Sequence, residues 1–404
     1  MSLFFRFAAV HSLLMGLLPF FIVILLWQQG FLLWQLSAFI ALTGLGFLLT
    51  LPAWHKLLQG NRWPTIIASS LTLEVVLVAA ILWMPNNALA LLVALLNGAY
   101  LCFYWMSQRT LFTRLSNTLS ESSSGNNSTS INSTGNNYGN FQLVVMVLLK
   151  IGILISAFLL DQGLEVILFV ITLAINILAW PFLKSVMSAE KMPALPTHYN
   201  PIAFNKSTAA VFFIDGIFLY LESYFWLLSL YLIAQQDVMQ LGLLVIVLTV
   251  LLAGLFWLLK SRIDAVAINI IFAIAVIGYA ISWLLRAYIG QDFNSTTGFI
   301  YPLILLIAFL TSFFRLSFNK RFFDHAHNYG PDSQSIIQYL MHKSYLSQWG
   351  IVIFFSLLAV LLGSSTISIG NQLSGVYGLA ALAVLLYGFY AQPFTTIKQG
   401  QHHA

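Results

Sequence analysis

Residues 184–205 read KSVMSAEKMPALPTHYNPIAFN, a stretch with three prolines and two lysines among small polar residues. Proline cannot continue a helix and disfavours helical backbone in the residue before it, so this stretch predicts a linker. On each side of the linker we count six long apolar segments. The sequence therefore predicts two halves, residues 1–183 and 208–404, joined by a linker at residues 184–207.

The composition excludes an ordinary soluble protein. Hydrophobic residues make up 60% of the chain, charged residues 7%, and the mean hydropathy is +0.89. Soluble domains carry charge on about a quarter of their residues. The apolar runs are unbroken over roughly 18 to 25 residues, which suits membrane-spanning helices and not the alternating pattern of a β-barrel. We therefore expect an all-α polytopic membrane protein with twelve transmembrane helices in a lipid bilayer.

The expected spans cover residues 4–27, 31–54, 64–84, 88–108, 142–160, 164–183, 208–234, 239–259, 265–286, 298–318, 337–362 and 375–394. With this assignment, 15 of the 17 basic residues fall on one side of the membrane, including Arg315 and Lys343. Arg286 falls on the other side, and Lys150 lies inside a span. Basic residues concentrate in cytoplasmic loops, so both termini and the linker are expected in the cytoplasm.

Two further features bear on the setting. Residues 116–140 are almost wholly Ser, Asn, Thr and Gly, which predicts a mobile cytoplasmic loop. The connections are otherwise short, which suggests a monomer in a bacterial inner (plasma) membrane. The net charge of +5 includes no long basic run, so we expect no nucleic-acid partner.

A weak internal repeat relates the two halves. The segment Arg109–Asn117 resembles Lys320–Asn328 at an offset of 211 residues, and Gly152-Ile-Leu-Ile resembles Gly350-Ile-Val-Ile at an offset of 198. The additional Ser/Asn-rich residues of the first half account for the difference. The repeat matches spans six apart, and an even offset gives both halves the same orientation in the membrane.

Six plus six helices, cytoplasmic termini and a cytoplasmic linker resemble the major facilitator superfamily over nearly the whole chain. Members usually carry a Gly-x-x-x-Asp-Arg-x-Gly-Arg signature after the second helix. Here that loop keeps Gly60 and Arg62 but has Asn61 where an acid is expected, so the chain resembles a divergent member. The resemblance implies a transporter whose halves rock around a central site.

Ionisable groups inside the bilayer are costly and are therefore candidate functional residues. Asp215 and Glu222 lie seven residues apart in the seventh span, on one helix face. The resemblance implies that this helix lines the central cavity, which favours a proton-coupling or cation-binding pair; a structural role is the alternative. Lys150, deep in the fifth span, is either a counter-charge for an anionic substrate or acidic residue, or part of a structural ion pair.

Other polar residues of the spans are weaker candidates. Glu74 and His11 are more simply explained as packed or hydrogen-bonded structure. Four residues can line the cytoplasmic half of a cavity and bind substrate there: Tyr104, Gln108, Arg315 and Gln348. Arg315 also fits plain anchoring at the cytoplasmic side.

The charged residues that follow spans 4 and 10 are candidates for gating. Arg109, Lys320, Arg321 and Asp324 can form and break ion pairs as the halves rock. Asp324, His325 and His327 also invite a metal interpretation, but their spacing matches no zinc pattern, so we expect no metal. The chain has no Walker loop or HExxH motif. We expect neither a cofactor nor enzymatic activity.

The sequence thus favours a secondary active transporter that moves a small organic solute by alternating access, with protons as the coupling ion through Glu222 or Asp215. The alternative is a membrane assembly or scaffold protein without a transport cycle, which the divergent signature loop favours. An enzyme acting on lipid ranks last, because no span pairs a nucleophile with a base.

Overall fold

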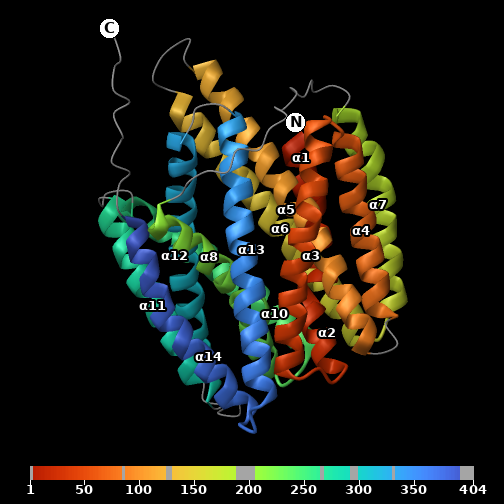
Figure 1. The fold of residues 1–404 in the computed structure, drawn as a ribbon, viewed down its shortest axis with the longest axis vertical. Helices are drawn as coiled ribbons and strands as arrows, with labels where there is room; N and C mark the ends of the chain where they lie inside the picture. Colours follow the sequence, from red (N-terminus) through yellow and green to blue (C-terminus); the bar gives the residue numbers. More distant parts are fainter. Residues whose placement is uncertain are drawn as a thin grey trace.

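The computed structural model describes residues 3–83, 87–123, 130–187, 205–263, 268–291, 299–329 and 333–391. Within these ranges the chain is helical and contains no strand (Figure 1). Ten of the described helices are long and apolar enough to cross a membrane, or eleven spans if one bent pair counts as a single span. The all-α polytopic class predicted from the sequence is therefore confirmed.

The elements follow the expected spans closely. They are α1 (Leu3–Gly16), η1 (Pro19–Phe21), α2 (Ile22–Gln28), α3 (Leu33–Gln59), α4 (Trp63–Leu82), α5 (Asn87–Ser123), α6 (Ser130–Asp161), α7 (Glu165–Met187), α8 (Lys206–Tyr220), η2 (Leu221–Trp226), α9 (Leu227–Ile233), α10 (Val238–Ile263), α11 (Ile268–Gly290), α12 (Ile300–Tyr329), α13 (Ser333–Gly363), α14 (Ile369–Val384) and η3 (Leu385–Ala391). The expected span at 142–160 lies within α6.

Two expected spans are not regular helices. The first bends by 44° between α1 and the helical segment that starts at Pro19. Proline lacks an N–H and its ring clashes with the preceding turn, which accounts for the break. The seventh span contains η2, a π-helical turn between α8 and α9. Such turns interrupt α-helices mostly at functional sites.

The Ser/Asn-rich segment contains more helix than the sequence predicts. Helix α5 continues to Ser123 and α6 starts at Ser130. Of the expected loop at residues 116–140, only 124–129 therefore lie outside the described helices. The predicted linker begins inside the last turns of α7, and residues 188–204 lie outside the described part of the chain.

Glycines lie where the helices cross at the shortest distance. Helices α1 and α6 cross where Gly16 faces Gly152, and a Cβ on Gly152 would collide with the carbonyl oxygen of Leu13. Where α8 and α13 cross, Gly216 lies against Ser347 and Gly350 lies against Phe213. Glycine permits such approaches because it has no side chain, as is common between helices in membranes.

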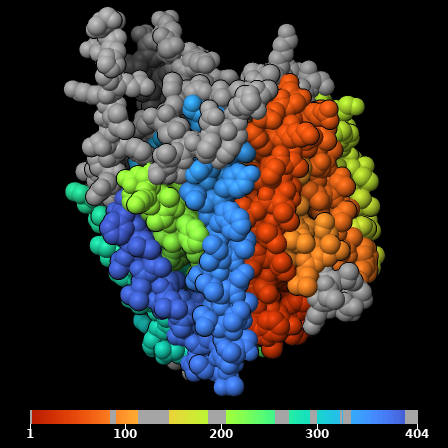
Figure 2. Space-filling model, viewed as in Figure 1, coloured from red at the N-terminus to blue at the C-terminus, as the bar shows by residue number. Residues whose placement is uncertain are grey.

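We call α1–α7 the N-terminal helices and α8–α14 the C-terminal helices. The two groups pack against each other through several pairs of helices. Helix α3 lies beside α13, and α6 packs on α10 (Figures 1 and 2). Neutral hydrogen bonds cross this interface: the Gln28 amide donates to the Tyr231 hydroxyl at 2.9 Å, and the Asn97 amide donates to the Tyr224 hydroxyl at 3.0 Å. The fold therefore encloses its central space between two groups of helices.

Candidate functional site

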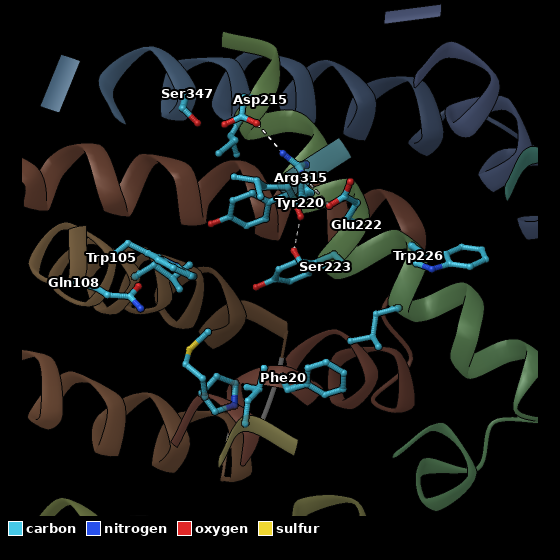
Figure 3. Close-up of a pocket in the computed structure, with 18 of the residues that line it drawn as sticks. Phe20, Trp105, Gln108, Asp215, Tyr220, Glu222, Ser223, Trp226, Arg315 and Ser347 are labelled. Atoms are coloured by element: carbon cyan, nitrogen blue, oxygen red, sulfur yellow. Dashed lines mark hydrogen bonds and ion pairs between the residues drawn. The ribbon is translucent and has the colours of Figure 1, made fainter. Parts of the chain in front are cut away.

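A cavity of about 730 Å³ lies between the N-terminal and C-terminal helices. Its walls come from α1, η1, α2, α3, α5 and α6 on one side and from α8, η2, α9, α10, α12 and α13 on the other. Aromatic side chains contribute much of the lining, among them Phe20, Trp105 and Trp226 (Figure 3). This volume is in the usual range for small-molecule sites. We call it the central cavity.

Asp215, on α8, is the most completely paired charged group of this cavity. Its Oδ1 accepts from Arg315 Nη1 at 2.8 Å and from the Tyr387 hydroxyl at 3.1 Å, while its Oδ2 lies 2.9 Å from Lys343 Nζ. Its side chain is 2% exposed. A buried carboxylate is tolerated when its partners are well placed, and here three donors from α12, α13 and η3 surround it.

Glu222, in the π-helical turn, has fewer partners and more access to the cavity. Its Oε2 lies 3.1 Å from Arg315 Nε, and the Tyr279 hydroxyl donates to Oε1. Its side chain is 16% exposed. Arg315 thus lies between the two carboxylates and bonds to both (Figure 3). We call Asp215, Glu222, Arg315 and Lys343 the charged cluster.

Arg315 and Lys343 correct the assignment of basic residues made from the sequence. Both were placed on the cytoplasmic side, whereas the structure places them within the bundle. Arg315 lies halfway along α12, and Lys343 lies ten residues after the start of α13, with its side chain 7% exposed. The acids of the seventh span required buried cations as partners. That requirement is a signal that could have identified Lys343 from the sequence. Arg315 was already a candidate for lining the cavity, and it does line it.

Arg286 is a second correction. It was expected at the outer end of the ninth span, residues 265–286, but α11 continues to Gly290 and Arg286 is only 1% exposed. Its guanidinium donates to the hydroxyls of Ser282 at 3.0 Å and Thr311 at 2.7 Å. It also stacks between Trp226 and Trp283, with centroid distances of 5.0 and 4.3 Å. No carboxylate pairs with it directly among the described residues.

Of the remaining candidates for the substrate site, Gln348 lines the cavity, and Tyr104 and Lys150 do not. Gln348, on α13, lines the cavity, and its buried Oε1 has no hydrogen-bond partner among the described residues. Tyr104 does not line it; the phenol ring packs in a buried aromatic group, 4.9 Å from the His11 ring. Lys150 is partly buried on α6, outside the lining, and has no ion-pair partner in the described part of the chain. It is not joined to the charged cluster.

Of the three gating candidates whose side chains the structure describes, Arg109 alone lines the cavity. Its Nη1 lies 3.5 Å from Ser344 Oγ on α13, a contact that crosses the interface. Lys320 is exposed on α12. The Arg321 guanidinium lies over the Phe272 ring at 4.8 Å. The side chain of Asp324 lies outside the described residues.

A separate buried polar pair lies among the N-terminal helices. His11 Nδ1 and Glu74 Oε2 are 3.7 Å apart, and both side chains are 0% exposed. Ser70 Oγ lies 3.2 Å from His11 Nε2. Neither carboxyl oxygen of Glu74 has a hydrogen-bond partner among the described residues. The pair connects α1 to α4 and does not line the central cavity.

The fold is similar to that of a solved membrane transporter. The chain matches the crystal structure of the nucleoside transporter NupG with a TM-score of 0.64 and 14% sequence identity, covering 97% of this chain and 99% of that one. A mutant of NupG matches with a TM-score of 0.61 and 13% identity, covering 96% and 98%. No protein-family model and no curated protein matches the sequence. The predicted resemblance to a divergent major facilitator transporter is confirmed at the level of the fold.

Proposed function

We propose that this protein is a secondary active transporter that moves a small organic solute through the central cavity by alternating access. The observation that carries the proposal is a solute-sized cavity, lined by the charged cluster, between two groups of membrane-spanning helices. A site near the middle of the bundle, between parallel repeats, suits a cycle in which the repeats rock around it.

The two groups would be six-helix halves, residues 1–183 and 208–404, with the predicted linker at 184–207 between them. The glycine crossings support this arrangement. Gly16 against Gly152 joins the first span to the fifth. Gly216 against Ser347 and Gly350 against Phe213 join the seventh span to the eleventh. These pairs occupy equivalent places six spans apart. Two halves with the same internal packing can move as rigid bodies.

Within this cycle we assign different roles to the two acids. Asp215 has two cationic partners and a phenol, and it holds α8, α12 and α13 together. Glu222 faces Arg315 from α12 and Tyr279 from α11, and it opens to the cavity. Glu222 is therefore the proposed proton-coupling residue. Arg109, Lys320, Arg321 and Asp324 remain proposed gating residues, and Gln348, Lys150 and Tyr104 proposed supporting polar residues.

Access to the cavity from both sides of the membrane tests the cycle. In a Cys102→Ser background, Ser223→Cys places one thiol on the exposed cavity wall. A membrane-impermeant maleimide should modify it both in right-side-out and in inverted vesicles. Val250→Cys, 66% exposed on α10 and outside the lining, is the control that the charged reagent should not reach. Reaction from one side only would favour the scaffold alternative.

Proton coupling is tested on Glu222. A thermal-shift screen of a metabolite library at pH 5.5 and 7.5 would first identify a solute, because a ligand of the native state raises the melting temperature. We expect Glu222→Gln to abolish uptake of that solute driven by a proton gradient and to retain exchange without the gradient. Full gradient-driven uptake by the variant would remove the coupling role.

The proposed setting is a bacterial inner membrane, with a monomer and both termini in the cytoplasm.

A further inference from the structure

Arg109 lines the central cavity and forms no ion pair with a carboxylate among the described residues. The cavity lining includes three cations, Arg109, Arg315 and Lys343, and two carboxylates, Asp215 and Glu222. Both carboxylates form their ion pairs with Arg315 and Lys343, and Arg109 takes part in none of these pairs. Its contacts are the 3.5 Å approach to Ser344 Oγ and a distant stacking on Trp105 at 5.8 Å. A guanidinium has five N–H donors, so most of its hydrogen-bonding capacity is unused within the described structure.

Arg286 adds to this imbalance from behind the cavity wall. Its guanidinium stacks on Trp226, which lines the cavity, and its direct polar partners are hydroxyl groups. The Arg286 Nε is buried and has no hydrogen-bond partner among the described residues. The cavity wall and the layer behind it therefore hold four cations and two carboxylates. Excess charge within a bilayer is costly unless an opposite charge comes near it.

We propose that the transported solute is an organic anion whose anionic group binds between Arg109 on α5 and Lys343 on α13. This inference rests on the proposed function, transport through the central cavity. The anionic group supplies the counter-charge that Arg109 lacks, and it contacts both groups of helices at once. A carboxylate or a phosphate suits a guanidinium fork, which binds either group through paired hydrogen bonds.

The rest of the cavity lining indicates the chemical character of the uncharged part of this anion, which we call its body. Aromatic side chains, including Phe20, Tyr220 and Trp226, form an apolar wall. Gln348 adds a polar side chain to the lining. The solute therefore has an apolar or aromatic body.

The charge of the cavity can be measured without knowing the solute. In the Cys102→Ser background, the Ser223→Cys thiol is reacted separately with anionic sulfonatoethyl methanethiosulfonate and with cationic trimethylammonioethyl methanethiosulfonate. The rate of each reaction is divided by the rate of the same reagent with a free thiol in solution. Surplus positive charge raises the local anion concentration, so we expect the anionic reagent to be favoured roughly tenfold. Arg109→Gln should remove most of this preference. Arg62→Gln, at an exposed position outside the cavity, is the matched control and should retain it.

Each outcome bears on a distinct claim. No reaction with either reagent would overturn the proposed function, and the inference with it. Reaction with both reagents and no anionic preference would overturn the inference alone, as would a preference that survives Arg109→Gln. In the metabolite screen, stabilising compounds should be anions whose effect is lost in Arg109→Gln and retained in Arg62→Gln. A neutral compound that stabilises both variants equally would refute the assignment.

Discussion

Asp215 and Glu74 are both buried carboxyl groups, but they differ in their partners. Asp215 accepts hydrogen bonds from Arg315, Lys343 and Tyr387. Glu74 lies 3.7 Å from His11 and has no hydrogen bond in the described structure. Removing one member of a buried ion pair leaves an uncompensated charge, whereas removing a charge without a firm partner does not. The same acid-to-amide substitution should therefore have different effects at the two sites.

We expect Asp215→Asn to lower the free energy of unfolding by about 3–5 kcal/mol, because it leaves Lys343 and Arg315 without their common counter-charge. Thermal unfolding of the purified protein in detergent measures the effect. The double variant Asp215→Asn with Lys343→Met removes one stranded cation and should recover part of the loss. If the double variant were no more stable than Asp215→Asn, the pairing would not be the cause.

Glu74→Gln keeps the shape of the side chain and removes the possibility of a charge at a site that is 0% exposed. A buried charged group without hydrogen bonds is costly, so the amide should change the free energy of unfolding by less than about 1 kcal/mol and in either direction. The same unfolding measurement compares it with Asp215→Asn. A loss as large as that of Asp215→Asn would show that Glu74 has a stabilising partner equal to those of Asp215.

Glycine crossings determine how closely the helices pack. At the crossing of α8 and α13, a Cβ on Gly350 would collide with the carbonyl oxygen of Phe213, which is backbone and cannot move aside like a flexible side chain. We expect Gly350→Ala to destabilise the protein by about 1–3 kcal/mol, as overpacking does. Gly375→Ala on α14, where no neighbouring atom lies within 4 Å, is the matched control. It should be neutral or stabilising, since alanine favours a helix. Equal melting temperatures for the two variants would show that the α8–α13 crossing can relax.

Hydropathy predicted most elements well, because the apolar runs of α3, α4, α7 and α10 end close to where the helices end. It did not predict the two irregular spans. Pro19 lies within a continuous apolar run, so length and hydropathy alone favoured one straight helix. The π-helical turn at 221–226 is a change of backbone hydrogen bonding, and its sequence has the same polarity pattern as a regular helix.

The candidate site was predictable in part. Asp215 and Glu222 were identified because acids in an apolar span need partners, and both line the cavity. Arg315 and Lys343 were counted with the basic residues of the cytoplasmic side, although both lie within expected spans, and only Arg315 was also considered for the cavity. Lys150 was placed deep in its span but does not line the cavity. The face on which a residue lies depends on helix rotation, which a single sequence of almost uniform apolar character does not define.

For the whole molecule, the contact of Gln28 with Tyr231 should control opening at one end of the bundle. In the Cys102→Ser background, Gln28→Cys with Tyr231→Cys allows a short bifunctional thiol cross-linker to join α2 to α9. We expect the cross-link to stop solute exchange and its reductive cleavage to restore it. Each single-cysteine variant, treated in the same way, is the control. Exchange that continues at full rate in fully cross-linked protein would contradict rocking at this interface.

The ion pairs of the described residues all lie within one group of helices: His11 with Glu74 in the first, and the charged cluster in the second. Between the groups, the Gln28–Tyr231 and Asn97–Tyr224 hydrogen bonds are neutral, and the charged Arg109 approaches the neutral hydroxyl of Ser344, so none of these three contacts is an ion pair. Dissolved salt weakens attraction between charges and hardly affects neutral hydrogen bonds. The rate at which the two groups separate should therefore depend little on ionic strength, and the protein would work at similar speed in dilute and in saline surroundings.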